Sequence, residues 1–441
     1  MENLILNSAI NSSANDSINT PLFLTQLQAL TRSKKLLIAY SGGLDSHVLL
    51  HLASALSKAE NYDVRALHVH HGLQQAADDW VNHCQKTCDE LNIPLEVDYL
   101  NLNLSIEKGL SIEELARTFR YSALDKSLQA GEVLLTAHHQ NDQAETLLLQ
   151  LFRGAGVQGL ASMPLISNFG LGQHARPLLP ESRQGLEHYA QVNELRHIED
   201  PSNKNSAFDR NFLRNEIIPQ LRARWPSIDK TISRSAGIQA ETKYLLDDLA
   251  QQDLASLQSN SDQGDYLAFA GLEKLSLPRQ RLLIRYWITT NGFNPPSERK
   301  LKHLFSDVIH ASEDAQPVLE WQGVEIRRYQ GKLYIMKPLQ DHDNKQVLGW
   351  TNPLSSLDIP SLGLTLPALL SSQYDDKFPV TIRFRKGGEK IHKRNHKANS
   401  SMRISLKNFM NESGIPPWLR SRIPLIYSGE NLIKVMGFEL E

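Results

Sequence analysis

Cysteine is scarce in this chain, and long apolar runs and a basic N-terminal segment are lacking. Only two cysteines occur among 441 residues, which excludes a disulfide scaffold and fits a reducing, cytoplasmic environment. Apolar runs such as 36–40 are far shorter than the roughly 18 residues of a membrane-spanning helix. Because the Asn- and Ser-rich start carries no basic segment, we expect a disordered tail over residues 1–30 and no signal peptide.

The composition is that of a globular protein, but its charge is unevenly distributed. Apolar residues make up 41% and charged residues 22% of the chain, and the net charge is −2. Between Val380 and Lys434, however, twelve Lys or Arg residues stand against three acids, a net charge of +9. The rest of the chain therefore sums to −11, and this basic end predicts a polyanionic partner.

The first half alternates strand-like and helix-like segments, which is the pattern of an α/β fold. Apolar runs predict strands at 36–40, 64–69, 95–100 and 133–137. Helical spacing of apolar residues predicts helices at 45–57, 80–91, 112–128 and 142–153. This order predicts a doubly wound parallel sheet with helices on both faces and ligands at the carboxyl ends of its strands.

The pattern changes after Pro219. Helical stretches at 233–257, 278–289 and 298–309 predict a helical middle domain, closed by strand-like pieces at 318–321, 324–328 and 332–336. Short alternating strands beyond residue 357 predict a small α+β C-terminal domain. The predicted division is a tail at 1–30, a nucleotide-binding domain at 31–220, a mainly helical domain at 221–340 and a basic domain at 350–441.

A glycine-rich turn between the first strand and the first helix carries the strongest functional signal. It consists of Ser41, Gly42, Gly43, Leu44, Asp45 and Ser46. Two glycines let the backbone approach an anion closely, and the helix N-terminus beyond them offers N–H groups to a phosphate. The serines add hydroxyl donors, and Asp45 is a candidate Mg²⁺ ligand because carboxylates suit hard cations. The alternative is an ordinary glycine turn in which Asp45 and Ser46 cap the helix.

A second polar segment, TAHHQNDQAET at 136–146, follows the fourth strand. In a parallel sheet this strand end lies beside the first loop, so His138 and Asp142 are candidates to orient a reacting phosphate or base. Glu145 follows Asp142 by three residues and shares its helix face. The alternative is packing at the strand end, with Asp142 as a helix N-cap.

Other phosphate and metal motifs are missing or lack their context. Gly154–Gly159 matches GxGxxG but follows a helix, so we interpret it as a helix end and a turn. The Walker pattern GxxxxGK[ST] does not occur in the sequence. The chain has no CxxC pair, and Cys84 and Cys88 are four residues apart on a predicted helix, which disfavours a zinc site.

Together these segments resemble the tRNA(Ile)-lysidine synthetase family. SGGLDS alone marks the wider PP-loop ATP pyrophosphatase group, which has an adenine nucleotide α-hydrolase-like fold. The resemblance becomes specific through AHHQNDQAET, through EDPSN at 199–203 with RNFLR at 210–214, and through IPPWLRSRIP at 415–424. It extends from about Lys34 to the C-terminus.

The resemblance implies a two-step ligation on isoleucine tRNA that carries a CAU anticodon. ATP adenylates the carbonyl oxygen of the wobble cytidine and releases pyrophosphate. The side-chain amine of free L-lysine then attacks that carbon, expels AMP and leaves lysidine. The implied cofactors are ATP and Mg²⁺, and no membrane is involved. The oligomeric state is left open, with a homodimer among the alternatives.

The same resemblance assigns roles to individual residues. It gives ATP binding to 41–46, with Asp45 toward Mg²⁺, and AMP transfer and lysine handling to His138, Asp142 and Glu145. Arg117 and Arg120 match its ARxxRY pattern, and one of them is expected to contact phosphate. Asn203, Arg210 and Arg214 are expected near lysine or the cytidine. The tRNA-binding candidates of the basic end are Arg383, Arg385, Lys386, Lys390, Arg403, Lys407, Arg420 and Arg422.

Three questions stay open from the sequence. Many family members carry a pair of acids where this chain has Asn141 and Asp142, so any role of the first acid is in doubt. Trp418 is interpreted as a packed aromatic in preference to a base-stacking one. The rival functions are tRNA thiolation or another tRNA adenylation by a PP-loop enzyme, and RNA binding without catalysis; the scarcity of cysteine argues against sulfur transfer.

Overall fold

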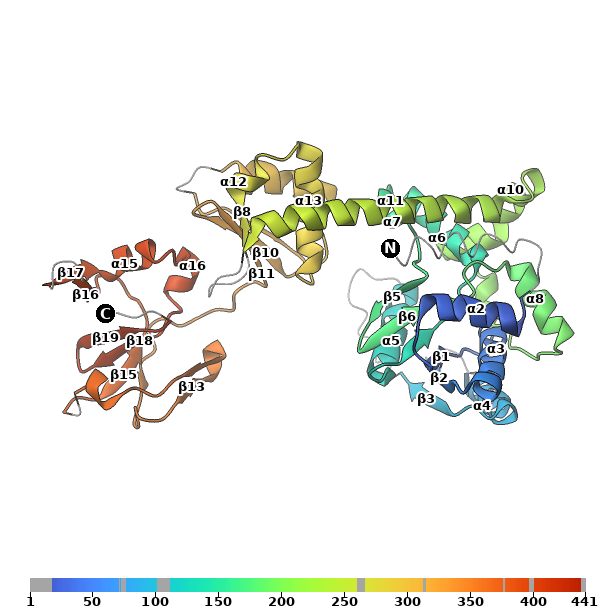
Figure 1. Ribbon diagram of the computed structural model, residues 1–441, viewed down its shortest axis with the longest axis horizontal. Coiled ribbons are helices and arrows are strands. Elements are labelled where there is room, and N and C mark those ends of the chain that lie inside the picture. Colours follow the sequence, from blue (N-terminus) through green and yellow to red (C-terminus); the bar gives the residue numbers. More distant parts are fainter. Residues whose placement is uncertain are drawn as a thin grey trace. The chain divides into compact units, whose positions relative to one another are not determined.

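The computed structural model in Figure 1 describes residues 18–70, 72, 77–100, 112–259, 266–311, 315–375, 377–395 and 400–437. The chain forms two compact units that divide between Leu246 and Asp247, within the long helix α11 (Ile228–Leu257). Every helix in these described ranges is too short or too polar to span a bilayer.

A six-stranded sheet organises the first unit. Its strands lie in the order β3-β2-β1-β4-β6-β5. Five of them run parallel, and β5 pairs antiparallel with β6 at one edge. The predicted doubly wound sheet is confirmed, and the β5–β6 hairpin is an addition to it. The bounds are β1 (Lys35–Ala39), β2 (Asp63–His70), β3 (Leu95–Tyr99), β4 (Val133–Leu135), β5 (Ile166–Phe169) and β6 (Gly172–Ala175).

Helices cover both faces of this sheet, because successive side chains of a strand point to opposite sides. In β1, Leu36 and Ile38 pack into the larger apolar cluster with residues of α3. Leu37 belongs to a second cluster with Leu124 on α5 and Leu128 just beyond it. Figure 1 shows α3 and α5 on opposite sides of β1. The helices of this unit before α11 are α2 (Thr20–Leu30), α3 (Leu44–Glu60), α4 (Ala77–Leu91), α5 (Ile112–Ser127), α6 (Gln140–Phe152), α7 (Val157–Leu160), α8 (Arg183–Val192), α9 (Asp209–Phe212) and α10 (Ile218–Arg224), with the 3-10 turn η1 (Pro201–Lys204) and the π-helical turn η2 (Leu213–Ile217).

The predicted tail ends too late in the sequence. Residues 20–30 form α2, whose first turn is capped by the Asn19 side chain. Phe23 and Leu27 are fully buried in the larger apolar cluster, so this segment belongs to the fold. The prediction of a disordered tail over 1–17 lies outside the described residues.

The second unit begins with helices and an antiparallel sheet. Its strands are ordered β7-β8-β11-β10-β9, and their apolar faces pack with α13 around the fully buried Trp287. The three strand-like pieces predicted between 318 and 336 are β9 (Val318–Trp321), β10 (Val324–Tyr329) and β11 (Lys332–Met336). The other elements are β7 (Gln258–Ser259), β8 (Tyr266–Ala268), α12 (Phe269–Leu272), α13 (Leu277–Thr290), α14 (Glu298–His303) and the π-helical turn η3 (Leu304–Ile309).

The basic end folds as short antiparallel strands with two short helices, as predicted. A four-stranded sheet is ordered β12-β15-β18-β19, and β13–β14 and β16–β17 form separate pairs. Two apolar clusters lie beneath these strands. The bounds are β12 (Leu348–Gly349), β13 (Leu357–Ile359), β14 (Leu364–Leu366), β15 (Val380–Arg383), β16 (Lys390–Asn395), β17 (Ser400–Ser405), α15 (Leu406–Glu412), α16 (Pro417–Arg420), β18 (Leu425–Ser428) and β19 (Asn431–Val435), with 3-10 turns η4 (Pro360–Leu362) and η5 (Ser371–Gln373).

Candidate active site

The turn after β1 requires glycine at its second position. Gly42 has φ +82°, a left-handed conformation that side chains disfavour. A Cβ atom there would lie 2.8 Å from Ile198 Cδ1 and 3.0 Å from Cys84 Sγ. The Ile198 N–H also donates to Gly42 O at 2.9 Å. The segment around Ile198 therefore closes directly on the glycine turn.

Helix α3 begins at this turn without a side-chain cap. Gly43 is its N-cap residue and, being a glycine, provides no side chain to accept a hydrogen bond from the first turn. The Ser46 hydroxyl donates to Gly43 O at 2.9 Å and lies 3.0 Å from the Ser41 hydroxyl. The alternative in which Asp45 and Ser46 cap this helix is therefore wrong. The first-turn N–H groups remain available to an anion, since a helix N-terminus also carries a positive partial charge.

Asp45 lies in the first turn of α3, and its two carboxylate oxygens have different surroundings. Oδ2 accepts from Arg183 Nη1 at 2.5 Å and lies 3.7 Å from His139 Nε2. Oδ1 is buried and has no hydrogen-bond partner among the described residues. Burial raises the pKa of Asp45, with Asp142 adding to the rise, while His139 and Arg183 oppose it. An unpartnered buried oxygen of this kind suits a cation.

The second motif meets the first through His139. This residue is the N-cap of α6, and its Nδ1 accepts from the Asp142 N–H at 3.4 Å. The Asp142 carboxylate in turn accepts from the His139 N–H at 3.1 Å, which completes a capping box. His139 Nε2 lies 3.5 Å from Asp142 Oδ2. The cap is thus His139, with Asp142 in the first turn, and this imidazole lies between the carboxylates of Asp45 and Asp142.

Two arginines bind both carboxylates of α6. Arg210 donates to Glu145 Oε2 at 2.8 Å and to Asp142 Oδ1 at 2.9 Å. Arg214 donates to Glu145 Oε1 at 2.6 Å and to Asp142 Oδ1 at 2.9 Å. Glu145 is only 2% exposed, so its charge depends on these partners. Arg214 lies in the π-helical turn η2, a local geometry that is frequent at functional sites.

The charges of this cluster fix the ionisation of Asp142. Burial alone would raise its pKa, but His139 and the guanidinium groups of Arg210 and Arg214 outweigh burial and hold the pKa of Asp142 well below its usual range. Hydrogen bonds to Glu145 likewise overcome burial and raise the pKa of Arg214. The carboxylate of Asp142 and the guanidinium of Arg214 therefore remain charged at neutral pH.

Asn141 forms a bridge that the sequence did not predict. Its Oδ1 accepts from the Arg183 N–H at 2.9 Å, and its Nδ2 donates to Asp229 Oδ1 at 3.2 Å. Asp229 also accepts from Arg222 at 2.6 and 2.9 Å. An amide can accept on one side and donate on the other, whereas a carboxylate at 141 would face that of Asp229. The departure from the acidic pair thus fits the local contacts of this chain.

The remaining predicted residues differ in their distance from this cluster. Arg117 lies over the Tyr121 ring, 5.0 Å from its centroid, and that ring meets the His174 ring at 6.0 Å. Arg120 is exposed on the same helix. Asn203 is exposed on η1, and its carbonyl accepts from Asn215 at 3.0 Å. Through the Tyr121 ring, the structure thus connects Arg117 with His174.

The predicted basic residues of the second unit fall into two groups. Arg383 pairs with Glu430 at 2.9 Å, and Arg422 donates to Gln340 O. Arg420 is only 8% exposed and donates to Ile415 O and Tyr329 Oη. The prediction that Arg420 binds tRNA is therefore wrong, because its guanidinium is buried in a structural contact.

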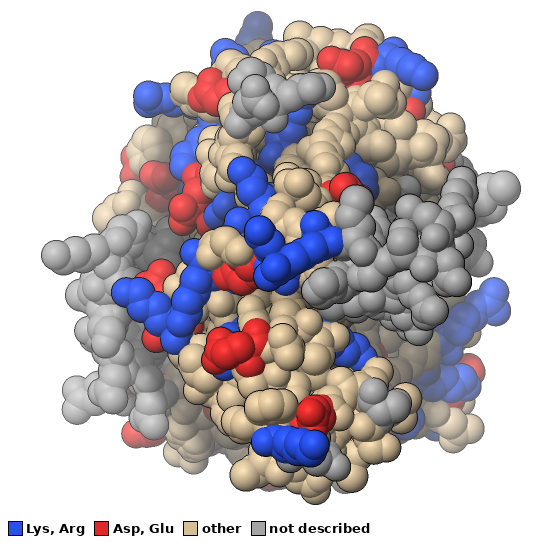
Figure 2. All heavy atoms as spheres, turned by 90° about the vertical axis from the view of Figure 1, so that its left-hand side faces the viewer, with Lys and Arg blue, Asp and Glu red and all other residues tan. Residues whose placement is uncertain are grey.

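The other group is exposed around the β16–β17 hairpin. Lys386 and Lys390 precede and begin β16, Arg403 lies on β17, and Lys407 lies on α15. Arg385 is half-buried beside them. Figure 2 shows Lys and Arg side chains gathered across the middle of the face on the side of the C-terminal strands. Among the side chains that the structure describes, these exposed cations are placed to meet phosphates.

Trp418 has the packed position that its proline neighbours predicted. Its ring meets those of Tyr334 at 5.6 Å and Tyr329 at 6.1 Å, and the Arg327 guanidinium lies 5.3 Å from its centroid. It is half-buried and connects the strands β10 and β11 with α16. This arrangement identifies Trp418 as a structural aromatic.

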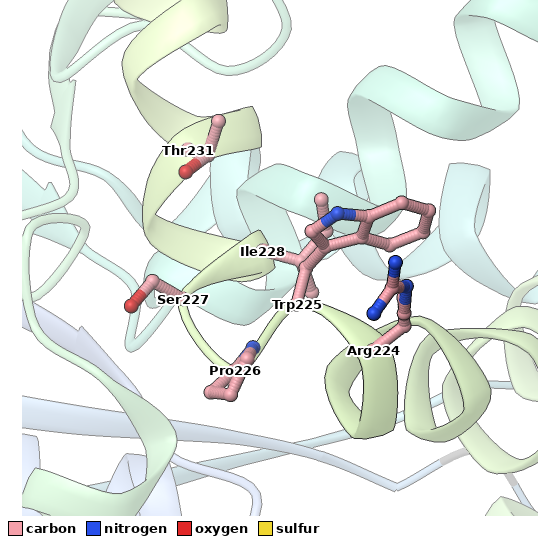
Figure 3. A pocket seen from close by; sticks show the side chains of 6 residues that line it. All are labelled: Arg224, Trp225, Pro226, Ser227, Ile228 and Thr231. Carbon is pink, nitrogen blue, oxygen red and sulfur yellow. The ribbon is translucent and has the colours of Figure 1, made fainter.

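A separate shallow pocket lies at the junction of α10 and α11. Figure 3 shows its lining side chains, with the Trp225 indole beside the Arg224 guanidinium; the others are Pro226, Ser227, Ile228 and Thr231. The Trp225 side chain is 56% exposed. None of the lining residues is a carboxylate or an imidazole. Unlike the cluster at the strand ends, this pocket therefore has no lining side chain that suits acid–base chemistry.

The bridge from Arg183 through Asn141 to Asp229 predicts that a negative charge at position 141 destabilises the protein. We expect Asn141→Asp to lower the free energy of unfolding by about 1–2 kcal/mol, because a donor to a charged group is lost and two carboxylates meet. Asp229→Asn should restore part of this loss in the double variant, and chemical denaturation measures both. Gln191→Glu is the control, since it makes an amide acidic on an exposed position. Equal effects of Asn141→Asp alone and with Asp229→Asn would contradict the bridge.

Comparisons with known proteins agree over most of the chain. Residues 17–221 match a PP-loop domain, 267–334 a TilS substrate binding domain and 380–441 a TilS substrate C-terminal domain. The chain is 43% identical over 417 residues to a tRNA(Ile)-lysidine synthase of Coxiella burnetii, covering 93% of this chain and 90% of the relative. It is 40% identical over 428 residues to that of Haemophilus influenzae, covering 94% and 96%. Near-complete coverage at this identity means that the chain belongs to the tRNA(Ile)-lysidine synthase family.

Proposed function

We propose that this protein ligates lysine to the wobble cytidine of the CAU anticodon of isoleucine tRNA. In the first step the carbonyl oxygen of the cytidine attacks the α-phosphate of ATP, and pyrophosphate leaves. In the second step the side-chain amine of lysine attacks the carbon that bears this oxygen, a C–N bond forms, and AMP leaves. The amine proton passes to a base, and the products are lysidine, AMP and pyrophosphate.

The observation that carries this proposal is the uncapped start of α3 beside Asp45. The first-turn N–H groups of α3, which no N-cap side chain occupies, form a binding place for the pyrophosphate part of ATP beside the Ser41 and Ser46 hydroxyls. Because these donors are held by the fold, they need no rearrangement when negative charge moves onto the leaving group. The first step is therefore assigned to the turn at 41–46.

The residues present also suit a magnesium ion. No group of three or more His, Cys, Asp or Glu side chains in the described ranges forms a cage for a metal. Mg²⁺ commonly binds through one or two carboxylates together with substrate phosphates. Asp45 Oδ1 is a buried oxygen that has no hydrogen-bond partner in the described part of the chain. Asp45 would hold Mg²⁺, which when bound offsets the charge of the ATP phosphates.

The acid–arginine cluster is assigned to the second step. Asp142 and Glu145 are buried carboxylates that attract an ammonium group. Glu145 is the candidate to accept the proton of the amine, because the lowered pKa of Asp142 makes that carboxylate a weak base. Arg210 and Arg214 are held close to them and can stabilise the departing phosphate of AMP. His138 and Arg117 are proposed to contact that phosphate, and Asn203 is a weaker candidate for the substrate because it is exposed.

The cysteines do not support the rival thiolation. Cys84 and Cys88 are fully buried on α4. Burial raises the pKa of each thiol to about 12, so neither is a thiolate at neutral pH. Sulfur transfer needs a reactive thiolate or a metal-bound cysteine set. Lysine ligation is therefore preferred.

The direct test supplies ATP, Mg²⁺, labelled L-lysine and CAU-anticodon isoleucine tRNA. We expect label in the tRNA and one AMP per lysine incorporated, whereas tRNA with a changed wobble base should stay unlabelled.

Asp45→Ala should abolish pyrophosphate release while tRNA affinity changes less than about twofold, because its carboxylate acts on ATP. Asp63→Ala, at the opposite end of the sheet, is the matched control. Full pyrophosphate release by Asp45→Ala would contradict the role of Asp45, and unlabelled tRNA with the intact enzyme would contradict the proposed function.

We propose that the exposed cations around β16 and β17 bind the phosphates of the tRNA. A triple change of Lys390, Arg403 and Lys407 to Gln should weaken tRNA binding and flatten its salt dependence, by a slope of roughly 0.7–0.9 for each lost phosphate contact. The control changes Lys274, Lys337 and Lys345 to Gln, which removes the same charge from exposed positions elsewhere in this unit. Filter binding between low and moderate salt distinguishes the two. If the salt dependence of tRNA affinity had the same slope in both triple variants, binding of phosphates by the cations around β16 and β17 would be contradicted.

A further inference from the structure

A chain of three hydrogen-bonded polar side chains lies behind His138 at the ends of β4 and β6. Arg176 Nη2 is 3.1 Å from His174 Nδ1. His174 Nε2 is 2.8 Å from the Thr136 hydroxyl, and this hydroxyl is 2.8 Å from His138 Nδ1. The chain leads from the sheet interior to the reactive motif.

The first member sets the direction of every hydrogen bond in the chain. A guanidinium has donors only, so His174 Nδ1 must accept from Arg176. His174 then carries its proton on Nε2 and donates to Thr136 Oγ1. The Thr136 hydroxyl, having accepted this bond, donates its own proton to His138 Nδ1. A neutral His138 whose Nδ1 accepts must carry its proton on Nε2.

The surroundings keep this direction from reversing. His174 is only 2% exposed, and the rings of Tyr121 and Phe169 lie 6.0 and 5.8 Å from its ring, centroid to centroid. Burial first, and then the charges of Arg176 and Arg117, lower the pKa of His174 to about 3. A protonated His174 would have no acceptor for Arg176, so the neutral form and the geometry agree. Arg176 is held from behind as well, since its Nη1 donates to Pro164 O at 2.8 Å.

The far nitrogen of His138 is the one left for a substrate. Within the described ranges its Nε2 has no hydrogen-bond partner, while Nδ1 is occupied by Thr136. Burial lowers the pKa of His138 as well, with Arg176 and Arg210 adding to the fall and Asp142 opposing it. His138 is therefore a neutral imidazole with one nitrogen already assigned.

We propose that Arg176, His174 and Thr136 are positioning residues that hold His138 as its Nε2–H tautomer, so that His138 donates a hydrogen bond to an anionic substrate oxygen. This inference rests on the proposed function only for the identity of that oxygen, the phosphate of the departing AMP. A His138 that donates from Nε2 does not accept the proton of the lysine amine there. That proton goes to a carboxylate, for which Glu145 is the neighbouring candidate.

The tautomer can be read directly in the substrate-free protein. Full-length enzyme labelled with ¹⁵N-histidine gives separate signals for protonated and unprotonated ring nitrogens, and His138→Gln identifies the signals of His138. We expect a protonated Nε2 and an unprotonated Nδ1. A proton on Nδ1 in the wild-type enzyme would overturn the proposal. Because no substrate is present, this result is independent of whether the proposed ligation is correct.

Paired variants separate positioning from packing. Thr136→Val keeps the shape of the side chain but removes the hydroxyl, and we expect a mixed His138 tautomer and a kcat lower by roughly ten- to a hundredfold. Thr136→Ser should retain the wild-type signals and kcat. In both variants KM for ATP and tRNA should change less than about twofold, since the ground-state contacts stay. Unchanged His138 signals and unchanged kcat in a folded Thr136→Val would also overturn the proposal.

A second pair covers the case in which Thr136→Val does not fold. His174→Gln can still accept from Arg176 and donate to Thr136, so it should keep the Nε2–H tautomer of His138. His174→Leu removes both hydrogen bonds of His174, so His138 should then populate both tautomers. Equal His138 spectra for the two variants would contradict the relay. A lysine-ligation failure together with the expected spectra would instead count against the proposed function alone.

Discussion

The carboxylate of Glu145 must find positive partners, and much of the catalytic unit depends on this requirement. A charge with 2% exposure is costly unless it is paired and hydrogen-bonded. Its partners come from Arg210 and Arg214, sixty-five and sixty-nine residues further along the chain. To reach them, the segment from Ile198 to η2 must cross the strand ends, where Ile198 also closes on Gly42. One buried acid thus brings the glycine turn, the α6 start and a distant segment into one site.

The cluster is balanced in charge before substrates arrive. Asp45, Asp142 and Glu145 are matched by Arg183, Arg210 and Arg214. In the proposed reaction the substrates bring phosphates, for which the arginines are suitable partners, and an ammonium group, for which the acids are. Binding then exchanges partners within a set that is already ordered, so little reorganisation is needed during the reaction. His139 lies between Asp45 and Asp142 and so connects the turn at 41–46 with the acids of α6.

Local signals in the sequence predicted the parts of the site that lie within one strand–loop–helix segment. The glycine turn and the 136–146 segment follow apolar strands, so topology alone brings their ends together. The β-α order likewise predicted the parallel sheet. Arg183, Asp229 and the His174–Arg176 pair were not predicted, because each acts through a residue about 40 to 140 positions away. No periodicity or spacing marks such contacts. Arg420 failed for the opposite reason: its charge was visible in the sequence, but its burial was not.

The central claim is that the cytidine is activated before lysine takes part. The most direct measurement incubates the enzyme with ATP, Mg²⁺ and CAU-anticodon isoleucine tRNA in the absence of lysine, and follows pyrophosphate and AMP separately. The account predicts up to one pyrophosphate per tRNA and almost no AMP, followed by AMP release and lysidine formation when lysine is added. Pyrophosphate release that requires lysine from the start would contradict an adenylated intermediate and the division of the site on which this account is built.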